Sequence, residues 1–236
     1  LDTKELIGME ALIRWNSSSL GKVMPNTFIP IAEDTGMILE LGEWILRTAC
    51  RQNKKWHDMG YANLVVAVNL SPIQFNQKNF GEKIKVILKE TRLSPQFLEL
   101  EVTERLLISD KRNVVDILHK LRALGVKISI DDFGTGYSSL SYIRDLPVDK
   151  LKIDRSFIKD IPDKDDGSIA NIIIELGKNL NLKINAEGVE TKEQERFLIE
   201  KKCNEVQGYL YSKPLSSEEF TISLKEGFDE KENKKS

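Results

Sequence analysis

The sequence has few of the residues that build zinc sites and disulfide frameworks, and it has no excess of positive charge. Its 236 residues include two cysteines and two histidines, and the formal net charge is −2. Cys50 and Cys203 have neither metal-binding nor redox spacing, so we expect two buried, reduced thiols. A net charge near zero gives no reason to expect nucleic-acid binding.

The sequence also lacks a long apolar segment. No uninterrupted apolar run approaches the roughly 18 residues that a membrane-spanning helix needs, and no signal-peptide pattern is present. We therefore expect no membrane contact by this segment and a cytoplasmic location, either free or as the cytoplasmic part of a membrane-anchored protein. Because the chain opens on Leu1 and not on Met, we expect it to be a piece of a longer protein.

Short apolar segments alternate with amphipathic ones along most of the chain. Alternation or a buried-type apolar run predicts strands, and helical spacing of apolar residues predicts helices. The predicted strands lie within 6–15, 64–70, 97–104, 127–133, 148–154, 182–186 and 206–211. The main predicted helices cover 27–36, 38–59, 80–91, 113–124, 169–180 and 192–201, and residues 16–25 read as a loop. Ser71-Pro72, Thr191 with Gln194, and Ser216 with Glu219 are helix-start patterns.

Repeated strand–helix alternation predicts a mainly parallel sheet covered by helices. Seven strands are countable, and eight would make a (β/α)8 barrel of about this length. An open doubly wound sheet is the runner-up, although no phosphate-binding fingerprint follows a first strand. We predict one domain over residues 1–228 and a charged tail over residues 229–236.

One strand ends in two adjacent acids and a glycine-rich turn. It reads Lys-Ile-Ser-Ile-Asp-Asp-Phe-Gly-Thr-Gly-Tyr over residues 127–137. Neighbouring carboxylates repel each other and are costly to desolvate unless a cation lies between them. A metal ion would solve this, and a solvated acidic turn with glycine supplying positive φ is the competing interpretation.

Every predicted strand has a polar or charged residue at or near its C-terminal end. These residues are Glu10, Asn69, Glu101, Asp131 with Asp132, Lys152, Glu187 and Gln207. Barrel active sites are assembled from the C-terminal ends of several strands, so we expect these side chains to share one mouth. Five acids in one site call for hard divalent cations, to which an asparagine can add a carbonyl oxygen.

The chemistry of this residue set suits phosphoester hydrolysis. His57 and His119 fall on the predicted helices and are expected on helix surfaces, which argues against zinc and for Mg²⁺ or Mn²⁺. Two such ions, roughly 3.5–4 Å apart, could activate a water and stabilise a leaving oxygen. Lys152 could orient that water, and Arg14 could clamp a phosphate, although a surface ion pair is the other interpretation of Arg14.

Ordered motifs along nearly the whole chain resemble one known family, the EAL domain. The motifs are Glu10-Ala11-Leu12 with Arg14-Trp15, Phe28-Ile29-Pro30 with Ala32-Glu33, Asn69-Leu70-Ser71, Glu101-Val102-Thr103-Glu104, Asp131-Asp132-Phe133-Gly134-Thr135-Gly136, Leu151-Lys152-Ile153-Asp154, Glu187-Gly188-Val189-Glu190-Thr191, Gln207-Gly208-Tyr209 and Ser212-Lys213-Pro214. The resemblance implies a TIM-like barrel whose first, antiparallel strand is missing from this chain.

The resemblance also implies a role for each matching residue. Glu10, Asn69, Glu101, Asp131, Asp132 and Glu187 resemble metal ligands, and Lys152, Glu187, Glu10 and Gln207 resemble the catalytic set. Arg14, Leu12 and Asp154 resemble substrate-binding residues. Glu104 resembles the acid that supports the loop from Asp131 to Tyr137, which the family also uses at a dimer interface, and Glu190 a further supporting residue of the mouth.

The implied activity is metal-dependent hydrolysis of cyclic di-GMP to linear pGpG in bacterial second-messenger signalling. It would use Mg²⁺ or Mn²⁺, as two ions, and Ca²⁺ should inhibit it. The resemblance further implies a homodimer and fusion to an upstream sensor or cyclase-like domain. The alternative is a catalytically silent receptor that binds cyclic di-GMP or a protein partner, but such members generally lose some of the acids, and this chain keeps them.

Overall fold

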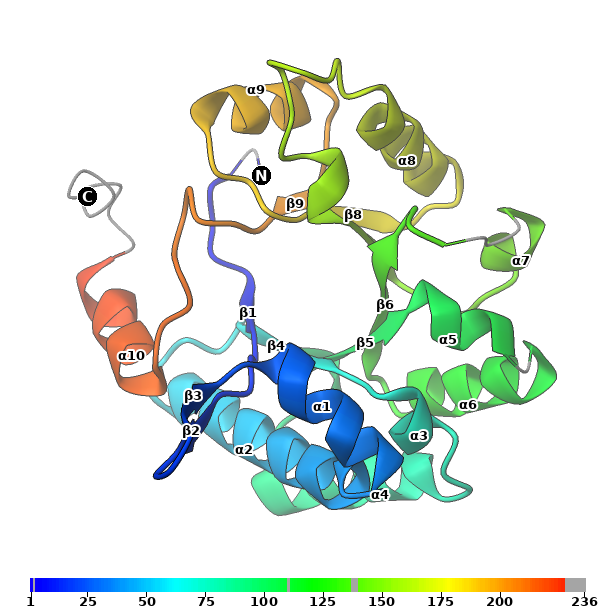
Figure 1. The fold of residues 1–236 in the computed structure, drawn as a ribbon, viewed down its shortest axis with the longest axis vertical. Coiled ribbons are helices and arrows are strands. Elements are labelled where there is room, and N and C mark those ends of the chain that lie inside the picture. The colour runs from blue at the N-terminus through cyan, green and yellow to red at the C-terminus, as the bar shows by residue number, and fades with distance from the viewer. Residues whose placement is uncertain (2, 110, 137–139, 228–236) are drawn as a thin grey trace. The chain divides into compact units, whose positions relative to one another are not determined.

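The computed structural model describes residues 1, 3–109, 111–136 and 140–227 (Figure 1). The predicted tail, residues 229–236, therefore lies outside the described residues. The main sheet consists of Gly8–Glu10 (β1), Val65–Asn69 (β4), Leu98–Thr103 (β5), Lys127–Phe133 (β6), Lys150–Ile153 (β7), Lys183–Ala186 (β8) and Glu205–Val206 (β9). A second, antiparallel pair is formed by Trp15–Ser17 (β2) and Gly21–Val23 (β3).

Helices occupy most of the segments between the strands. The α-helices are Pro25–Asp34 (α1), Ile38–Asp58 (α2), Pro72–Phe75 (α3), Phe80–Thr91 (α4), Glu104–Ser109 (α5), Lys111–Ala123 (α6), Leu140–Arg144 (α7), Ser168–Asn179 (α8), Lys192–Glu200 (α9) and Ser217–Glu226 (α10). Two short 3₁₀-helices cover Pro95–Phe97 (η1) and Arg155–Phe157 (η2). No described helix is both long enough and apolar enough to span a bilayer.

The strand order decides between the two predicted architectures. Parallel ladders join β1 to β4, β4 to β5, β6 to β7, β7 to β8 and β8 to β9. The order in the sheet, β1-β4-β5-β6-β7-β8-β9, follows the chain with the hairpin left out. A doubly wound sheet would reverse its order at a switch point, so that alternative is wrong. Within the described residues, no antiparallel strand pairs with β1.

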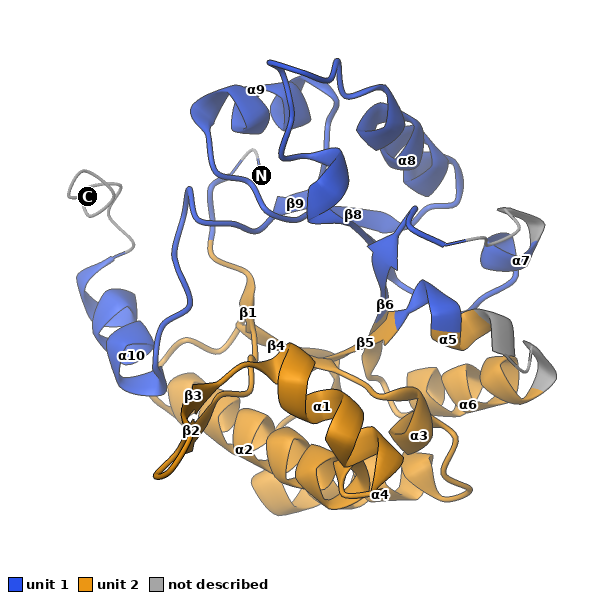
Figure 2. Cartoon of the chain, viewed as in Figure 1, with its two compact units in different colours: residues 1–5, 103–105, 129–236 blue, residues 6–102, 106–128 orange. Residues whose placement is uncertain are grey.

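The chain divides into two compact units, which Figure 2 colours separately. Unit 1 comprises residues 1–5, 103–105 and 129–236, and it holds β7, β8, β9 and most of β6. Unit 2 comprises residues 6–102 and 106–128, and it holds β1, β4, the hairpin and most of β5. Each unit has its own apolar interior, built from the strands and the helices that pack on them.

In unit 2 the long helix α2 illustrates how that interior forms. It buries a stripe at helical spacing that includes Leu46, Ala49, Cys50 and Trp56. Trp44 in the same helix lies off this stripe and is 57% exposed. In unit 1, apolar residues of β7, β8 and α8 are buried; they include Leu151, Ile153, Ile174 and Ile184.

Local start signals predicted several elements correctly. Ser71, Thr191 and Ser216 are N-caps whose hydroxyls accept backbone hydrogen bonds, and each belongs to a capping box. Both thiols are free and buried, as predicted, and burial raises the pKa of Cys50 to about 12 and of Cys203 to about 11. Neither thiol is therefore a thiolate at neutral pH.

Two predicted segments are wrong. The segment expected to be a loop after Trp15 contains most of the hairpin β2–β3, in which Trp15 pairs with Val23. The last strand was predicted over 206–211 but covers Glu205–Val206 only. Beyond it the backbone turns back, since Val189 N donates to the Gln207 carbonyl and Leu210 N donates to the Val189 carbonyl.

Candidate active site

Lys152 is the centre of the candidate site in unit 1. It lies on β7, its side chain is 1% exposed, and its Nζ is 3.0 Å from Asp131 Oδ1 and 2.6 Å from Glu187 Oε1. These acids stand on β6 and directly after β8, the two strands that flank β7 in the sheet. A buried ammonium needs such partners, and two carboxylates this close need a cation. Three neighbouring strands thus bring three of the predicted residues together.

A bulge in β6 sets the positions of the paired acids. The register between β6 and β7 shifts between Ile130 and Phe133, and Asp132 has φ +53°, a left-handed conformation that is uncommon for a residue other than glycine. Burial raises the pKa of Asp132, and the negative charges of Asp131 and Asp154 raise it further. Asp132 therefore belongs electrostatically to the same cluster of acids.

Glu104 anchors the glycine-rich turn that follows β6. It begins α5, it is 4% exposed, and its Oε2 accepts hydrogen bonds from Gly134 N at 3.1 Å and Gly136 N at 3.2 Å. A Cβ on Gly136 would lie 2.8 Å from the Glu104 carboxylate carbon, so the contact requires glycine. Tyr137, the end of the predicted loop, lies outside the described residues.

Three further predicted residues of unit 1 are held by local contacts. Asp154 caps η2, where its Oδ1 accepts from Ser156 N at 3.0 Å. Glu190 pairs with Arg155, whose Nη2 is 3.0 Å from Glu190 Oε1. Gln207 follows β9, and its backbone N–H donates to the Ala186 carbonyl at 2.8 Å, which continues the ladder beside β8.

Unit 2 holds the other predicted oxygen ligands. Glu10 ends β1 and Asn69 ends β4, and Asn69 Nδ2 donates to Glu10 Oε1 at 2.6 Å. Glu101 on β5 is the cross-strand partner of Asn69 and is 2% exposed. The C-terminal ends of neighbouring parallel strands therefore bring Glu10 and Asn69 into contact and place Glu101 beside Asn69.

The predicted substrate residues of unit 2 are exposed. Leu12 is 42% exposed, and Arg14 is an exposed residue just before the hairpin. Arg14 Nη1 donates to the carbonyl of Ile13 at 2.8 Å, a contact that leaves most of its N–H groups for other partners. An exposed guanidinium beside Glu10 and Leu12 in the chain suits the recognition of an anionic ligand.

Two of the predicted oxygen ligands face one cation in unit 1, the Lys152 ammonium. Asp131 and Glu187 already direct one oxygen each at the Lys152 ammonium, so their geometry is that of two carboxylates facing one cation. Across the described ranges, no group of three or more His, Cys, Asp or Glu side chains is close enough to hold a metal ion. The ammonium occupies the position between two of the acids, and Asn69 is an amide. The six-residue ligand set stays a prediction.

The two histidines lie on helices of unit 2. His119 is exposed on α6, as predicted. His57 was also expected on a helix surface, but it is partly buried in α2, with Nε2 2.8 Å from the Leu64 carbonyl and its ring edge-on to Phe97. Its contacts are structural, which explains a histidine here without a ligand role.

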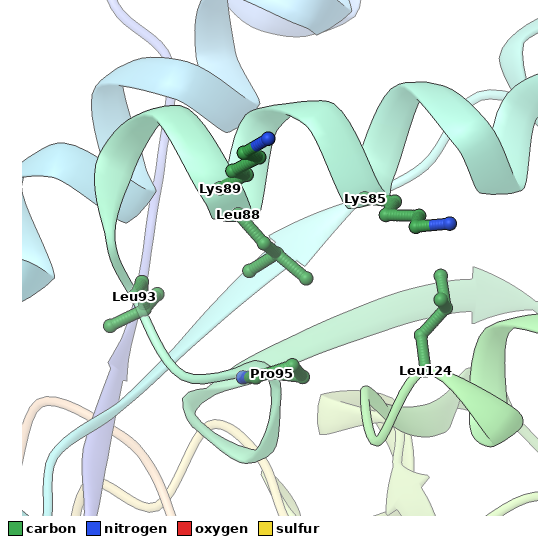
Figure 3. A pocket seen from close by; sticks show the side chains of 6 residues that line it. All are labelled: Lys85, Leu88, Lys89, Leu93, Pro95 and Leu124. Atoms are coloured by element: carbon green, nitrogen blue, oxygen red, sulfur yellow. The ribbon is translucent and has the colours of Figure 1, made fainter.

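A cavity of about 250 Å³ opens elsewhere in unit 2 (Figure 3). It lies between α4, the segment after it and the end of α6, and its lining residues are Lys85, Leu88, Lys89, Leu93, Pro95 and Leu124. In Figure 3 the leucines and the proline enclose the space, and the lysine amines are at the α4 side. These segments precede β5 and β6, whereas the predicted site residues follow or end strands. The cavity contains no acid and does not serve the same chemistry.

Sequence analysis missed one polar residue that lies beside Lys152. Asn185 on β8 is the cross-strand partner of Lys152 and is 7% exposed. The signal was present, because Lys-Ile-Asn-Ala places an amide inside an otherwise buried strand. Only the register with β7 connects that amide to the site.

Comparison with known proteins identifies the class of domain that carries this set of residues. A family model described as the EAL domain matches residues 1–214. The bifunctional diguanylate cyclase/cyclic di-GMP phosphodiesterase MucR of Pseudomonas aeruginosa is 47% identical over 93% of this chain and 32% of its own length. The cyclic di-GMP phosphodiesterase NbdA of the same organism is 47% identical over 89% of this chain and 27% of its own length.

Solved structures confirm the fold. The PaMucR phosphodiesterase in complex with c-di-GMP superposes with a TM-score of 0.87 at 47% identity, covering 91% of this chain and 87% of that one. The FimX EAL domain of Pseudomonas aeruginosa, at 21% identity and a TM-score of 0.79, covers 87% of this chain and 82% of that one and supports the fold alone. The predicted TIM-like architecture is thus confirmed. The chain spans about a third of the length of the curated relatives it matches.

Proposed function

The chain belongs to the EAL domain family, and from this we propose that it is a phosphodiesterase that hydrolyses cyclic di-GMP to linear pGpG. The observation that carries the proposal is the buried Lys152 ammonium, held between the carboxylates of Asp131 and Glu187 at the ends of adjacent parallel strands. The names of the relatives, MucR and NbdA, support cyclic di-GMP as the substrate.

The proposed cofactor is Mg²⁺ or Mn²⁺, bound as two ions. Its ligands would be the oxygen-bearing residues Glu10, Asn69, Glu101, Asp131, Asp132 and Glu187. When bound, such ions supply an activated water and charge stabilisation at the phosphate. Hard cations with oxygen ligands match this donor set better than zinc does.

The chain's own side chains would orient the water, bind the substrate phosphate and hold the site in shape. Lys152, which is paired with Asp131 and Glu187, orients the attacking water and offsets negative charge developing on the phosphate. Arg14 binds a phosphate of the substrate through its N–H groups, and the side-chain amide of Gln207 donates to the same phosphate. Glu104 holds the turn after β6 in the conformation that presents Asp131 and Asp132.

A turnover assay tests the proposal. The protein is incubated with cyclic di-GMP and Mg²⁺, and the products are separated by chromatography; pGpG is the expected product. Glu10→Ala should reduce turnover to background, because it removes a proposed metal ligand. Binding of cyclic di-GMP without turnover would select the silent receptor. Full activity of Glu10→Ala would contradict the role given to Glu10.

Larger assemblies are also part of the proposal. The chain matches about a third of MucR, whose name includes a cyclase activity, which supports an upstream domain in the whole protein. We propose in addition that the domain forms a homodimer and works in the cytoplasm in second-messenger signalling. Sedimentation of the isolated domain tests the dimer.

A further inference from the structure

Asn185 is a buried amide placed beside the central lysine. It is paired with Lys152 in the parallel ladder of β7 and β8, and cross-strand partners in a ladder direct their side chains to the same face of the sheet. Asn185 is 7% exposed and Lys152 is 1% exposed. Within the described part of the chain, Asn185 Oδ1 is buried and accepts no hydrogen bond.

An amide oxygen left without a donor in the interior is unfavourable. Ile184 and Ala186 are buried on the opposite face of β8, and an apolar residue at position 185 would leave no polar atom unpaired. Glu205, the cross-strand partner on the other side, pairs with Lys150 at 2.6 Å and Lys183 at 3.3 Å, and its carboxylate offers no N–H donor. Lys152, the partner in the ladder with β7, has N–H donors on the same face of the sheet as Asn185.

The ion-pair partners of that ammonium are also proposed metal ligands. Lys152 Nζ lies 3.0 Å from Asp131 Oδ1 and 2.6 Å from Glu187 Oε1. A divalent cation bound by these carboxylates would compete with Lys152 for the same oxygens. A neutral amide oxygen that is not a metal ligand would still be available, and it lies on the adjacent strand.

We propose that Asn185 is a positioning residue for Lys152: its Oδ1 accepts a hydrogen bond from the ammonium when a divalent cation engages Asp131 and Glu187. The inference rests on the proposed function, since it takes those two acids as metal ligands. It adds that the chain contains a prepared acceptor for Lys152, which allows the acids to turn to the metal while the ammonium stays at the site.

Asn185→Leu tests this, because leucine has the same branching at Cγ and no acceptor. Mn²⁺ affinity is measured by titration calorimetry without substrate, and thermal stability is measured in EDTA. We expect roughly tenfold weaker Mn²⁺ binding. The midpoint temperature of thermal unfolding in EDTA should be unchanged or higher, because the variant removes a buried oxygen that lacks a hydrogen-bond donor. With cyclic di-GMP, kcat should fall and KM should stay within about twofold. Asn185→Thr retains a side-chain oxygen in a residue suited to strands, and it should recover part of the affinity.

Asn53→Leu is the matched control. Asn53 is also a fully buried asparagine with an Oδ1 that accepts nothing in the described structure, but its Nδ2 donates to the carbonyls of Leu64 and Phe97 in unit 2. Asn53→Leu removes these two hydrogen bonds, so it should lower the midpoint temperature of thermal unfolding in EDTA. It should leave the Mn²⁺ affinity unchanged.

The outcomes separate this inference from the proposed function. Wild-type Mn²⁺ affinity and wild-type kcat in Asn185→Leu would overturn the inference while leaving the phosphodiesterase proposal intact. A wild-type protein that binds Mn²⁺ but does not turn over cyclic di-GMP would overturn the proposed function, and the weaker Mn²⁺ binding of Asn185→Leu would still support the inference. A wild-type protein that binds no Mn²⁺ would overturn the inference.

Discussion

Two hydrogen bonds to the Glu104 carboxylate hold the turn that follows β6. Gly134 N and Gly136 N both donate to one oxygen of Glu104, and Gly136 has no room for a Cβ beside that carboxylate. The side chain of Glu104 and the glycine at 136 therefore act as one unit. Asp131 and Asp132 lie immediately before this turn, so their orientation depends on it.

Gly136→Ala should lower kcat about tenfold, an increase of about 1.4 kcal/mol in the activation barrier. The added methyl group would push the Glu104 carboxylate away and release the turn. The control is Gly81→Ala in α4, where a Cβ meets no atom within 4 Å. That change should leave kcat unaltered and stabilise the helix by about 0.5–1 kcal/mol. Steady-state kinetics measures kcat and urea unfolding measures stability for each variant. An unchanged kcat in Gly136→Ala would show that the turn has no role in turnover.

Between elements, ion pairs tie α2 to α4 on the surface of unit 2. Glu43 on α2 accepts a hydrogen bond from Lys83 on α4, and its other oxygen is 3.5 Å from Arg47 Nη2. Arg47 in turn pairs with Glu90 on α4. The hydrogen bond from Lys83 is the largest cause that lowers the pKa of Glu43 below its usual 4.5. The four residues form a small network and not an isolated pair.

Glu43→Gln should reduce the free energy of unfolding at pH 7 by about 0.5–1 kcal/mol, the upper part of the range for partly exposed pairs. A carboxyl whose pKa is lowered in the folded state stabilises that state above its unfolded pKa, and the effect is lost as the pH falls through the lowered folded value. The difference between wild type and variant should therefore shrink below about pH 4.5. Urea unfolding at pH 7 and pH 3.5 measures it.

Glu82→Gln provides the comparison for that experiment. Glu82 lies 3.8 Å from Lys85 within α4, and both side chains are more than 60% exposed. Such a pair contributes little, so stability should not change at either pH. An equal loss in the two variants would show that the α2–α4 network has no special role.

For the whole chain, the proposed function makes stability depend on divalent cations. A ligand that binds the folded state alone at 100 times its Kd adds about 2.7 kcal/mol. Mg²⁺ and Ca²⁺ should therefore both raise the midpoint of thermal unfolding relative to EDTA. Ca²⁺ should nevertheless inhibit turnover, since it prefers longer bonds of about 2.3–2.6 Å and more ligands than Mg²⁺. Thermal unfolding and turnover are measured in parallel with each ion. Full activity with Ca²⁺ would contradict the predicted inhibition.

The sequence alone determined where most of the helices and strands form and where the polar strand ends fall. Helix α4 begins at Phe80 and ends at Thr91 as predicted, and the capping boxes at Thr191 and Ser216 form as predicted. These features depend on residues within one or two turns of each other, so a local pattern contains the required information. The order of acids, amides and lysine along the strands indicated an oxygen-rich site for the same reason.

Only the tertiary structure decided how those groups meet. Lys152 lies between Asp131 and Glu187, which are distant in sequence, and the bulge at Asp132 depends on the register of β6 with β7. The hairpin after Arg14 and the short last strand likewise depend on pairing partners and not on local propensity. The position of Asn185 next to Lys152 is a further example. It follows from the register of β7 with β8, which no short stretch of sequence specifies.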